Sequence, residues 1–448
     1  MGVNPNETSR LAEHEQPPPR SAPDQPRRPV QRREIVAWAL IDWANSAYST
    51  LLITILVAYL QSFVLPGNAG ILAYGWGLGV SMFLSAWLSP ILGAMADARA
   101  NKRAWLICTS FTGAAGGVLM GVVPKEFPWV FVALFFVTSL AFELSFSFYN
   151  GFLPELSDEA SLNRISGYGY AAGYFGGGVA LAAVIALLTL GTPRGLSTET
   201  GLRIGLVLMG VWWAMFTLPA AIILRDRAVP RGHRLGLWAT ARQALREVAH
   251  TLSRVRAYSM LALFLLGFLL YNEGIQTVMS QASVFAREVL DMSPGELGLV
   301  VLMIQFVATP AAIGVGWVAD RAGPKATLLV CLAVWCGLLV AAYFVREKWQ
   351  FWCLGVVLSL VMGGTQSVSR AVMGAMTPPS KTAEFFGFFN LSCRATSMVG
   401  PILFSEMLVL TKSANLAISS LLVFIVLGAA VVFCVNLPKG VAQAKAEA

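Results

Sequence analysis

The stretch Gly93-Ala-Met-Ala-Asp97-Ala-Arg99-Ala-Asn-Lys102-Arg103 recurs, in altered form, as Gly316-Trp-Val-Ala-Asp320-Arg321-Ala-Gly323-Pro-Lys325. Each copy has a glycine, an aspartate four residues later and basic residues just beyond, and each follows an apolar segment. Glycine lets two helices approach closely, and the aspartate and bases can form ion pairs that break when helices move apart. We therefore predict a conformational latch that comprises Gly93, Asp97, Lys102, Arg103, Gly316, Asp320, Arg321, Gly323 and Lys325.

Long apolar segments surround both copies. The chain has 448 residues, of which 56% are hydrophobic and only 12% are charged, about half the charge of an average soluble domain. An apolar stretch of about 20 residues is long enough to cross a bilayer as a helix. We expect twelve such spans, at 35–65, 72–96, 104–123, 129–153, 164–190, 202–224, 257–283, 297–319, 326–345, 349–374, 384–410 and 414–437. The prediction is an all-α polytopic membrane protein, and a soluble enzyme is excluded.

The basic residues orient these spans. Of the 32 Lys and Arg residues, 23 fall in the two termini and the loops on one side of the predicted spans, and 7 fall in the loops on the other. Loops rich in Lys and Arg stay in the cytoplasm, so we expect both termini to be cytoplasmic. The formal net charge of +8 is thereby explained without a nucleic-acid partner.

The longest loop divides the spans six and six. We expect a disordered basic tail at 1–33, a six-helix bundle at 34–224, a cytoplasmic linker at 225–256, a second bundle at 257–437 and a short tail at 438–448. In the linker, Trp238, Ala241, Leu245, Val248 and Leu252 recur at helical spacing among arginines. This pattern predicts a basic amphipathic helix on the lipid surface, with a plain solvated linker as the alternative.

Twelve spans in two halves, a central loop and a duplicated loop motif resemble the major facilitator superfamily. The resemblance covers nearly all of residues 34–437, and the second motif copy fits the family pattern well. In the first copy, Ala98 and Ala100 stand where the family usually has arginine and glycine. The family implies alternating access, in which two pseudo-symmetric bundles rock around a site near the midplane.

A narrower resemblance lies in the first span. The segment Trp38-Ala-Leu-Ile-Asp42-Trp-Ala-Asn45-Ser-Ala-Tyr48 is similar to the opening helix of the vacuole effluxer-like branch, which includes autophagy-linked amino-acid exporters. Glycoside–cation symporters and their lysolipid-transporting relatives share its Asp-x-x-Asn pattern. The resemblance implies amino acids as the favoured substrate class, and sugars, glycosides or lysolipids as alternatives.

A few ionisable side chains lie well inside the predicted spans. Such groups cost about 2.5–3.5 kcal/mol at the bilayer centre, so they usually face a bundle interior or a water-filled path. Glu143 is our leading candidate for proton or cation coupling, and for Arg394 we expect either a substrate carboxylate or an acidic side chain as the partner. For Arg370, near the end of its span, we expect a salt bridge or a snorkelling side chain. The substrate- or ion-binding residues that we predict, chosen with polar neighbours on the same helical faces, are Asp42, Asn45, Glu143, Asn150, Asn272, Glu273, Gln276 and Arg394.

The sequence thus favours a secondary transporter of a small organic solute, coupled to protons or sodium as a symporter or antiporter. We expect it in a bacterial cytoplasmic (inner) membrane, in contact with lipid. The six cysteines lack CxxC spacing and the three histidines lie in polar segments, so we expect neither a cofactor nor a metal site. A membrane sensor or enzyme remains a remote alternative.

Overall fold

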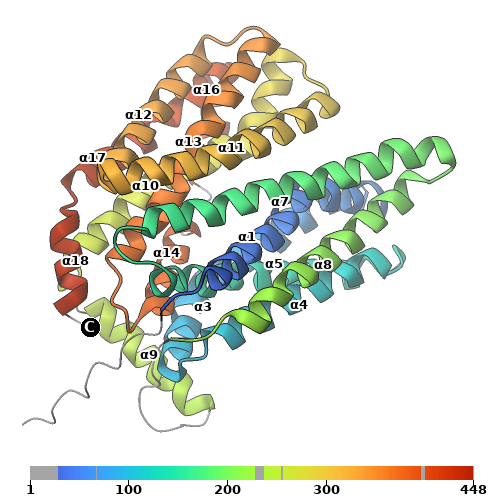
Figure 1. The fold of residues 1–448 in the computed structure, drawn as a ribbon. Coiled ribbons are helices and arrows are strands. Elements are labelled where there is room, and N and C mark those ends of the chain that lie inside the picture. The colour runs from blue at the N-terminus through green and yellow to red at the C-terminus, as the bar shows by residue number, and fades with distance from the viewer. Residues whose placement is uncertain (1–28, 67, 228–236, 254–255, 395–398, 447–448) are drawn as a thin grey trace, which may run out of the picture.

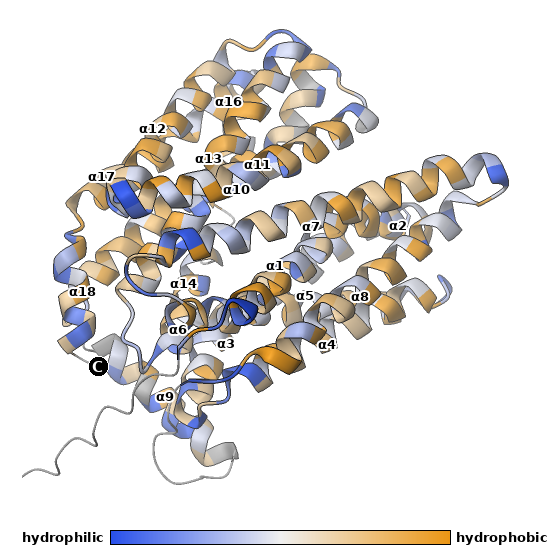
Figure 2. Ribbon diagram, viewed as in Figure 1, coloured by the Kyte–Doolittle hydropathy of each residue, from blue (hydrophilic) through white to orange (hydrophobic). Residues whose placement is uncertain are grey.

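The computed structural model describes residues 29–66, 68–227, 237–253, 256–394 and 399–446. Throughout these residues the chain is helical and contains no strand. Eleven of the described helices are long and apolar enough to cross a membrane, and Val399–Thr411 is a shorter apolar helix. Figure 2 shows hydrophobic residues along the lengths of these helices and hydrophilic residues gathered near α9 and α18. The fold is that of an all-α polytopic membrane protein, as predicted.

The first group of helices, here called the N-half, runs from α1 to α8. Its elements are α1 (Arg32–Leu51), η1 (Leu52–Leu56), α2 (Val57–Tyr59), η2 (Leu60–Val64), α3 (Asn68–Arg99), α4 (Lys102–Val122), α5 (Pro128–Gly151), α6 (Leu153–Leu156), α7 (Leu162–Gly191), η3 (Thr192–Arg194) and α8 (Thr198–Ile223). Two segments of the first span, η1 and η2, are wound as π-helix. Tyr48, Phe135 and Trp213 are fully buried in the apolar core of this half.

The second group, here called the C-half, runs from α10 to α17. Its elements are α10 (Ser259–Leu290), α11 (Pro294–Ala322), α12 (Pro324–Tyr343), α13 (Lys348–Ala375), α14 (Thr382–Arg394), α15 (Val399–Thr411), α16 (Ala414–Ser420) and α17 (Leu422–Cys434). The span predicted at 384–410 is represented by α14 and α15, and residues 395–398 between them lie outside the described residues. Phe264, Trp335 and Ile425 are fully buried in a separate core.

The two halves meet along a few helices and diverge at one end. Figure 1 shows them converging near α9 (Leu237–Ser253) and α18 (Leu437–Ala446) and separating toward the other ends of α7 and α11. Helix α7 packs against α11 and α13, and α14 packs against α3 and α5. We call the convergent end the α9 end. The predicted linker helix is present as α9, but Ala241, Ala244 and Val248 pack with Ala94 and Met95 of α3, so this part of its apolar face contacts the protein and not the lipid surface that was predicted.

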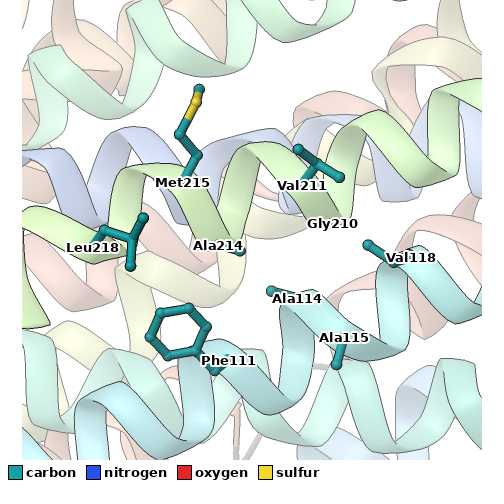
Figure 3. Close-up of a pocket in the computed structure, with 9 residues that line it drawn as sticks. All are labelled: Phe111, Ala114, Ala115, Val118, Gly210, Val211, Ala214, Met215 and Leu218. Atoms are coloured by element: carbon teal, nitrogen blue, oxygen red, sulfur yellow. The ribbon is translucent and has the colours of Figure 1, made fainter.

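An apolar groove lies on the side of the N-half, between α4 and α8. It has a volume of about 460 Å³ and is lined by Phe111, Ala114, Ala115, Val118, Gly210, Val211, Ala214, Met215 and Leu218, as Figure 3 shows. None of these side chains is ionisable or can form a conventional hydrogen bond. The groove therefore lacks the groups that would recognise a polar solute, and the candidate site lies elsewhere.

Candidate functional site

Arg370 of α13 lies between the two halves and is completely buried. Its Nε donates to the Ser166 hydroxyl at 2.9 Å, and its Nη2 donates to the Ser166 carbonyl oxygen at 2.6 Å. Its Nη1 donates to Asn150 Oδ1 at 3.3 Å and lies 3.6 Å from Asp42 Oδ2. Of the two outcomes expected for Arg370, the structure has the salt bridge.

Three aromatic rings enclose the Arg370 guanidinium. Its carbon lies 4.1 Å from the centre of the Tyr170 ring, 5.1 Å from that of Trp38 and 5.2 Å from that of Tyr149. Trp38 and Tyr149 are themselves stacked, with ring centres 4.7 Å apart. The Trp38 indole donates to the Tyr149 carbonyl oxygen at 2.9 Å. Cation–π attraction and this packing hold the guanidinium in one orientation.

Glycines of α7 make room for these groups. A Cβ on Gly173 would lie 2.7 Å from Ser46 Oγ and 3.0 Å from Asp42 Oδ1. A Cβ on Gly169 would lie 2.7 Å from Arg370 Nη2. The close approach of α7 to α1 and α13 therefore depends on glycine, because small residues let helices pack closely.

The predicted site residues of the N-half do not form one cluster. Asp42 and Asn150 meet through Arg370, whereas the Asn45 amide donates to Ser145 Oγ at 3.4 Å. Asn45 is fully buried, and its Oδ1 has no hydrogen-bond partner. Glu143 is buried on α5, and its carbonyl oxygen accepts a hydrogen bond from Asn390 of α14 at 3.4 Å. Glu143 thus lies where α5 packs against the C-half.

Three of the predicted residues lie on α10, which packs against α14 and α15. Glu273 is buried, and its Oε1 accepts a hydrogen bond from the Gly400 backbone N–H at 2.7 Å. Gly400 belongs to α15, so this hydrogen bond joins the Glu273 side chain to the backbone of a neighbouring helix. Asn272 is buried and Gln276 is half-buried on the same helix. The Arg394 side chain lies outside the described residues.

The two predicted latch aspartates lie at the α9 end, and each accepts hydrogen bonds from a helix of the opposite half. Asp97, on α3 of the N-half, accepts a hydrogen bond from the Glu384 N–H at 2.9 Å, in the first turn of α14. Asp320, on α11 of the C-half, accepts from the Asn163 and Arg164 N–H groups at 3.2 Å each, in the first turn of α7. Each carboxylate therefore stabilises the N-terminus of a helix in the other half.

The glycines and bases of the two motif copies differ in what they contact. A Cβ on Gly93 would overlap the Ala383 carbonyl oxygen, and one on Gly316 would lie 2.8 Å from the Asn163 carbonyl oxygen. Lys102 is fully buried and contacts Glu155, Gly151 and, in the other half, Thr382. The other bases have contacts within their own halves: Arg103 with Ala221, Arg321 with Trp317, and Lys325 with Phe433. Gly323 has a φ of 93°, and Ala100, at the matching place in the first copy, has a φ of 49°.

At the end opposite α9, two surface ion pairs each stay within one half. Lys125 pairs with Glu199 at 2.8 Å in the N-half, and Lys348 pairs with Glu296 at 2.9 Å in the C-half. The hydrogen bond to Glu199 raises the pKa of Lys125. Each pair therefore links two segments of the same half at this end of the structure.

The predicted site did not include Arg370, its aromatic partners or Ser166. Trp38, Tyr149 and Tyr170 form the enclosure, and Ser166 supplies two of the short hydrogen bonds. Trp38 stands one helical turn before Asp42, and Tyr149 directly precedes Asn150. This proximity to predicted residues was the available signal, since aromatic rings often flank a buried guanidinium.

The two helical halves have the fold of the major facilitator superfamily. The human organic anion transporter MFSD10 (TETRAN) has the same fold, with a TM-score of 0.70 and 14% identity over 90% of this chain and 100% of that one. The proton:xylose symporter XylE also has a TM-score of 0.70, with 14% identity over 92% of this chain and 98% of its own.

Within this superfamily the chain belongs to the vacuole effluxer Atg22-like family, whose model matches residues 68–445. It is 28% identical to the uncharacterized MFS-type transporter YxiO of Bacillus subtilis, over 88% of this chain and 92% of that protein. It is 30% identical to autophagy-related protein 22-1 of Aspergillus niger over 56% of this chain and 43% of that protein. The chain thus spans less than half of that fungal relative. The relatives are transporters, which confirms the prediction that this protein is not an enzyme.

Proposed function

We propose that this protein moves a small organic solute across the membrane by alternating access, with an amino acid as the favoured solute. The observation that carries the proposal is the pair of helix caps at the α9 end. Asp97 and Asp320 hold hydrogen bonds that cross between the halves, so they form or break together when the halves rock. This behaviour is what the predicted latch requires.

The α9 end would face the cytoplasm of a bacterial cell, with both termini there. The distribution of Lys and Arg supports this orientation. In that case the described conformation is closed to the cytoplasm and open toward the outside. The opposite conformation would form after the two caps break, and the solute site would then face the cytoplasm.

The mixture of groups between the halves supports an amino acid as the solute. Asp42 and Arg370 offer one negative and one positive charge, and Asn45 offers an unused amide oxygen. These groups match the ammonium and carboxylate of a zwitterion in sign and number. The effluxer name of the family model agrees with an export role.

Glu143 is our candidate for ion coupling. The residue is buried on α5, and its backbone carbonyl oxygen contacts Asn390 of α14, so protonation of its carboxyl would occur beside the contact between the two halves. Carboxyl groups inside membrane spans often belong to proton relays. The experiment below distinguishes coupling to sodium from coupling to protons.

The test is gradient-driven flux in sealed proteoliposomes. Purified protein would be supplied with labelled amino acids, xylose or lysophosphatidylcholine, under an imposed proton gradient or sodium gradient. We expect amino-acid flux under one gradient, and Glu143→Gln should uncouple or stop it. Glu406→Gln is the matched control, because Glu406 is exposed at the outer part of α15. Unaltered flux in Glu143→Gln removes Glu143 from the mechanism, and absence of flux for every solute refutes the proposed function.

A further inference from the structure

Arg370 belongs to the C-half, but the partners that hold its side chain all belong to the N-half. These partners, which we call the Arg370 socket, are Trp38, Asp42, Tyr149, Asn150, Ser166 and Tyr170. The guanidinium therefore bridges the interface between the two halves. A motion that separates the halves at the α9 end must withdraw it from the socket.

The ion pair with Asp42 is not the geometry that a guanidinium and a carboxylate normally adopt. Such a pair usually forms two parallel hydrogen bonds of about 2.7–2.9 Å. Here the contact is a single one of 3.6 Å, between Arg370 Nη1 and Asp42 Oδ2. The same Asp42 oxygen accepts a shorter hydrogen bond, of 3.0 Å, from the Tyr149 hydroxyl. The fork of Arg370 is thus occupied by Ser166 and Asn150, and no carboxylate fills it.

Withdrawal from the socket leaves the guanidinium without its hydrogen-bond acceptors and its counter-charge. Arginine stays protonated in proteins, so it carries its positive charge into the opened path. Its neutral partners are then lost together with Asp42. A charge inside the membrane is costly without water or a counter-charge. An oxyanion that enters from the α9 end would supply two parallel hydrogen bonds and that counter-charge.

We propose that, when the α9 end is open, Arg370 binds the carboxylate of the transported solute in this bidentate manner. The proposal rests on the alternating access argued above. A singly charged carboxylate suits the site better than a phosphate dianion, because one guanidinium is available and Asp42 stands beside it. When the α9 end closes, the Arg370 side chain returns to the socket, and the carboxylate is displaced toward the other end.

The test measures the distance between the halves while defined solutes are added. Spin labels would be placed at Ala160→Cys in the N-half and Ala322→Cys in the C-half, both exposed near the α9 end, in a chain whose six cysteines are replaced. Four probe pools are used: the twenty amino acids; lactate, pyruvate and succinate; glucose, xylose and putrescine; and glycerol 3-phosphate alone. We expect only pools with a carboxylate to lengthen the distance.

Arg370→Lys keeps the charge and removes the fork, so it separates carboxylate binding from folding. We expect it to raise the half-effective concentration at least 10-fold, while both distances still occur without solute. Arg346→Lys is the matched control, at an exposed arginine that contacts Tyr343 and Val345. Its half-effective concentration should equal that of the parent chain.

Four results would overturn the assignment: a response to the carboxylate-free pool or to glycerol 3-phosphate, no response to any pool, an unchanged response in Arg370→Lys, or loss of response in Arg394→Lys alone. Failure of this inference is distinguishable from failure of the proposed function. Flux of a carboxylate solute that ignores Arg370→Lys refutes the inference only, whereas absence of all gradient-driven flux refutes the transport proposal.

Discussion

Replacing Asp320 with alanine should release the α9 end. Asp320 Oδ1 accepts from the Asn163 backbone N–H at 3.2 Å and from its side-chain amide at 3.0 Å, and Oδ2 accepts from the Arg164 N–H at 3.2 Å. The Asn163 and Arg164 amides lie in the first turn of α7, where N–H groups have no acceptor within the helix. Their protection from solvent exchange therefore depends on Asp320, which belongs to the other half.

The magnitude follows from the hydrogen bonds that are lost. A hydrogen bond to a charged group contributes about 1.5–3 kcal/mol net. In the variant, water can replace some of the three hydrogen bonds of Asp320, so we count a net loss of one hydrogen bond. These bonds exist only while the halves are joined, so the loss raises the population of the open α9 end by roughly 10- to 150-fold.

Backbone hydrogen–deuterium exchange measures this change in the label-free chain. In Asp320→Ala, the Asn163 and Arg164 amides should exchange roughly 10- to 150-fold faster, because local opening sets the rate. The decisive signal is distant. The Glu384 amide, which Asp97 holds on the other side of the interface, should also exchange faster if both caps break in one motion.

The control is Asp158→Ala, which removes an exposed carboxylate that contacts Ser161 within the same half. It should leave exchange at Glu384 unchanged. If Asp320→Ala accelerates exchange only at Asn163 and Arg164, then Asp320 is a local helix cap. The reasoning that makes it part of a latch would then be refuted.

Two further substitutions test the motif copies. Ala100→Gly should stabilise the protein by about 1 kcal/mol, measured by denaturation, because Ala100 has a φ of 49° where its counterpart is Gly323; an unchanged or lowered stability would contradict the strain argument. Gly93→Val should disfavour the closed α9 end, because its side chain would overlap the Ala383 carbonyl; faster exchange at the Glu384 amide supports this, and unchanged exchange contradicts it.

Local pattern predicts well whatever depends on one segment. The first span was expected at 35–65, and the helix runs over Arg32–Val64, because hydropathy alone decides where a chain can lie in a bilayer. The two motif copies were found because they repeat. The structure then adds what no single copy shows, namely that each aspartate caps a helix of the opposite half.

The Arg370 socket could not be predicted in the same way. Helical spacing shows which residues share a face, but not which helix lies against that face. Asp42, Asn150 and Ser166 come from three helices of one half, and Arg370 comes from the other. The choice of partner depends on tertiary packing.

The contrast between the contacts within each half and those between the halves explains how such a protein can move. Within the halves, fully buried aromatic residues such as Trp213 and Trp335 form separate apolar cores, and their exposure to water would cost about 25 cal/mol per Å². At the α9 end, the caps at Asp97 and Asp320 and the bonds of Arg370 are polar. Water or a solute can replace polar partners at a small net cost. In the proposed mechanism the halves would therefore move as rigid bodies, and the polar contacts between them would determine which end is open.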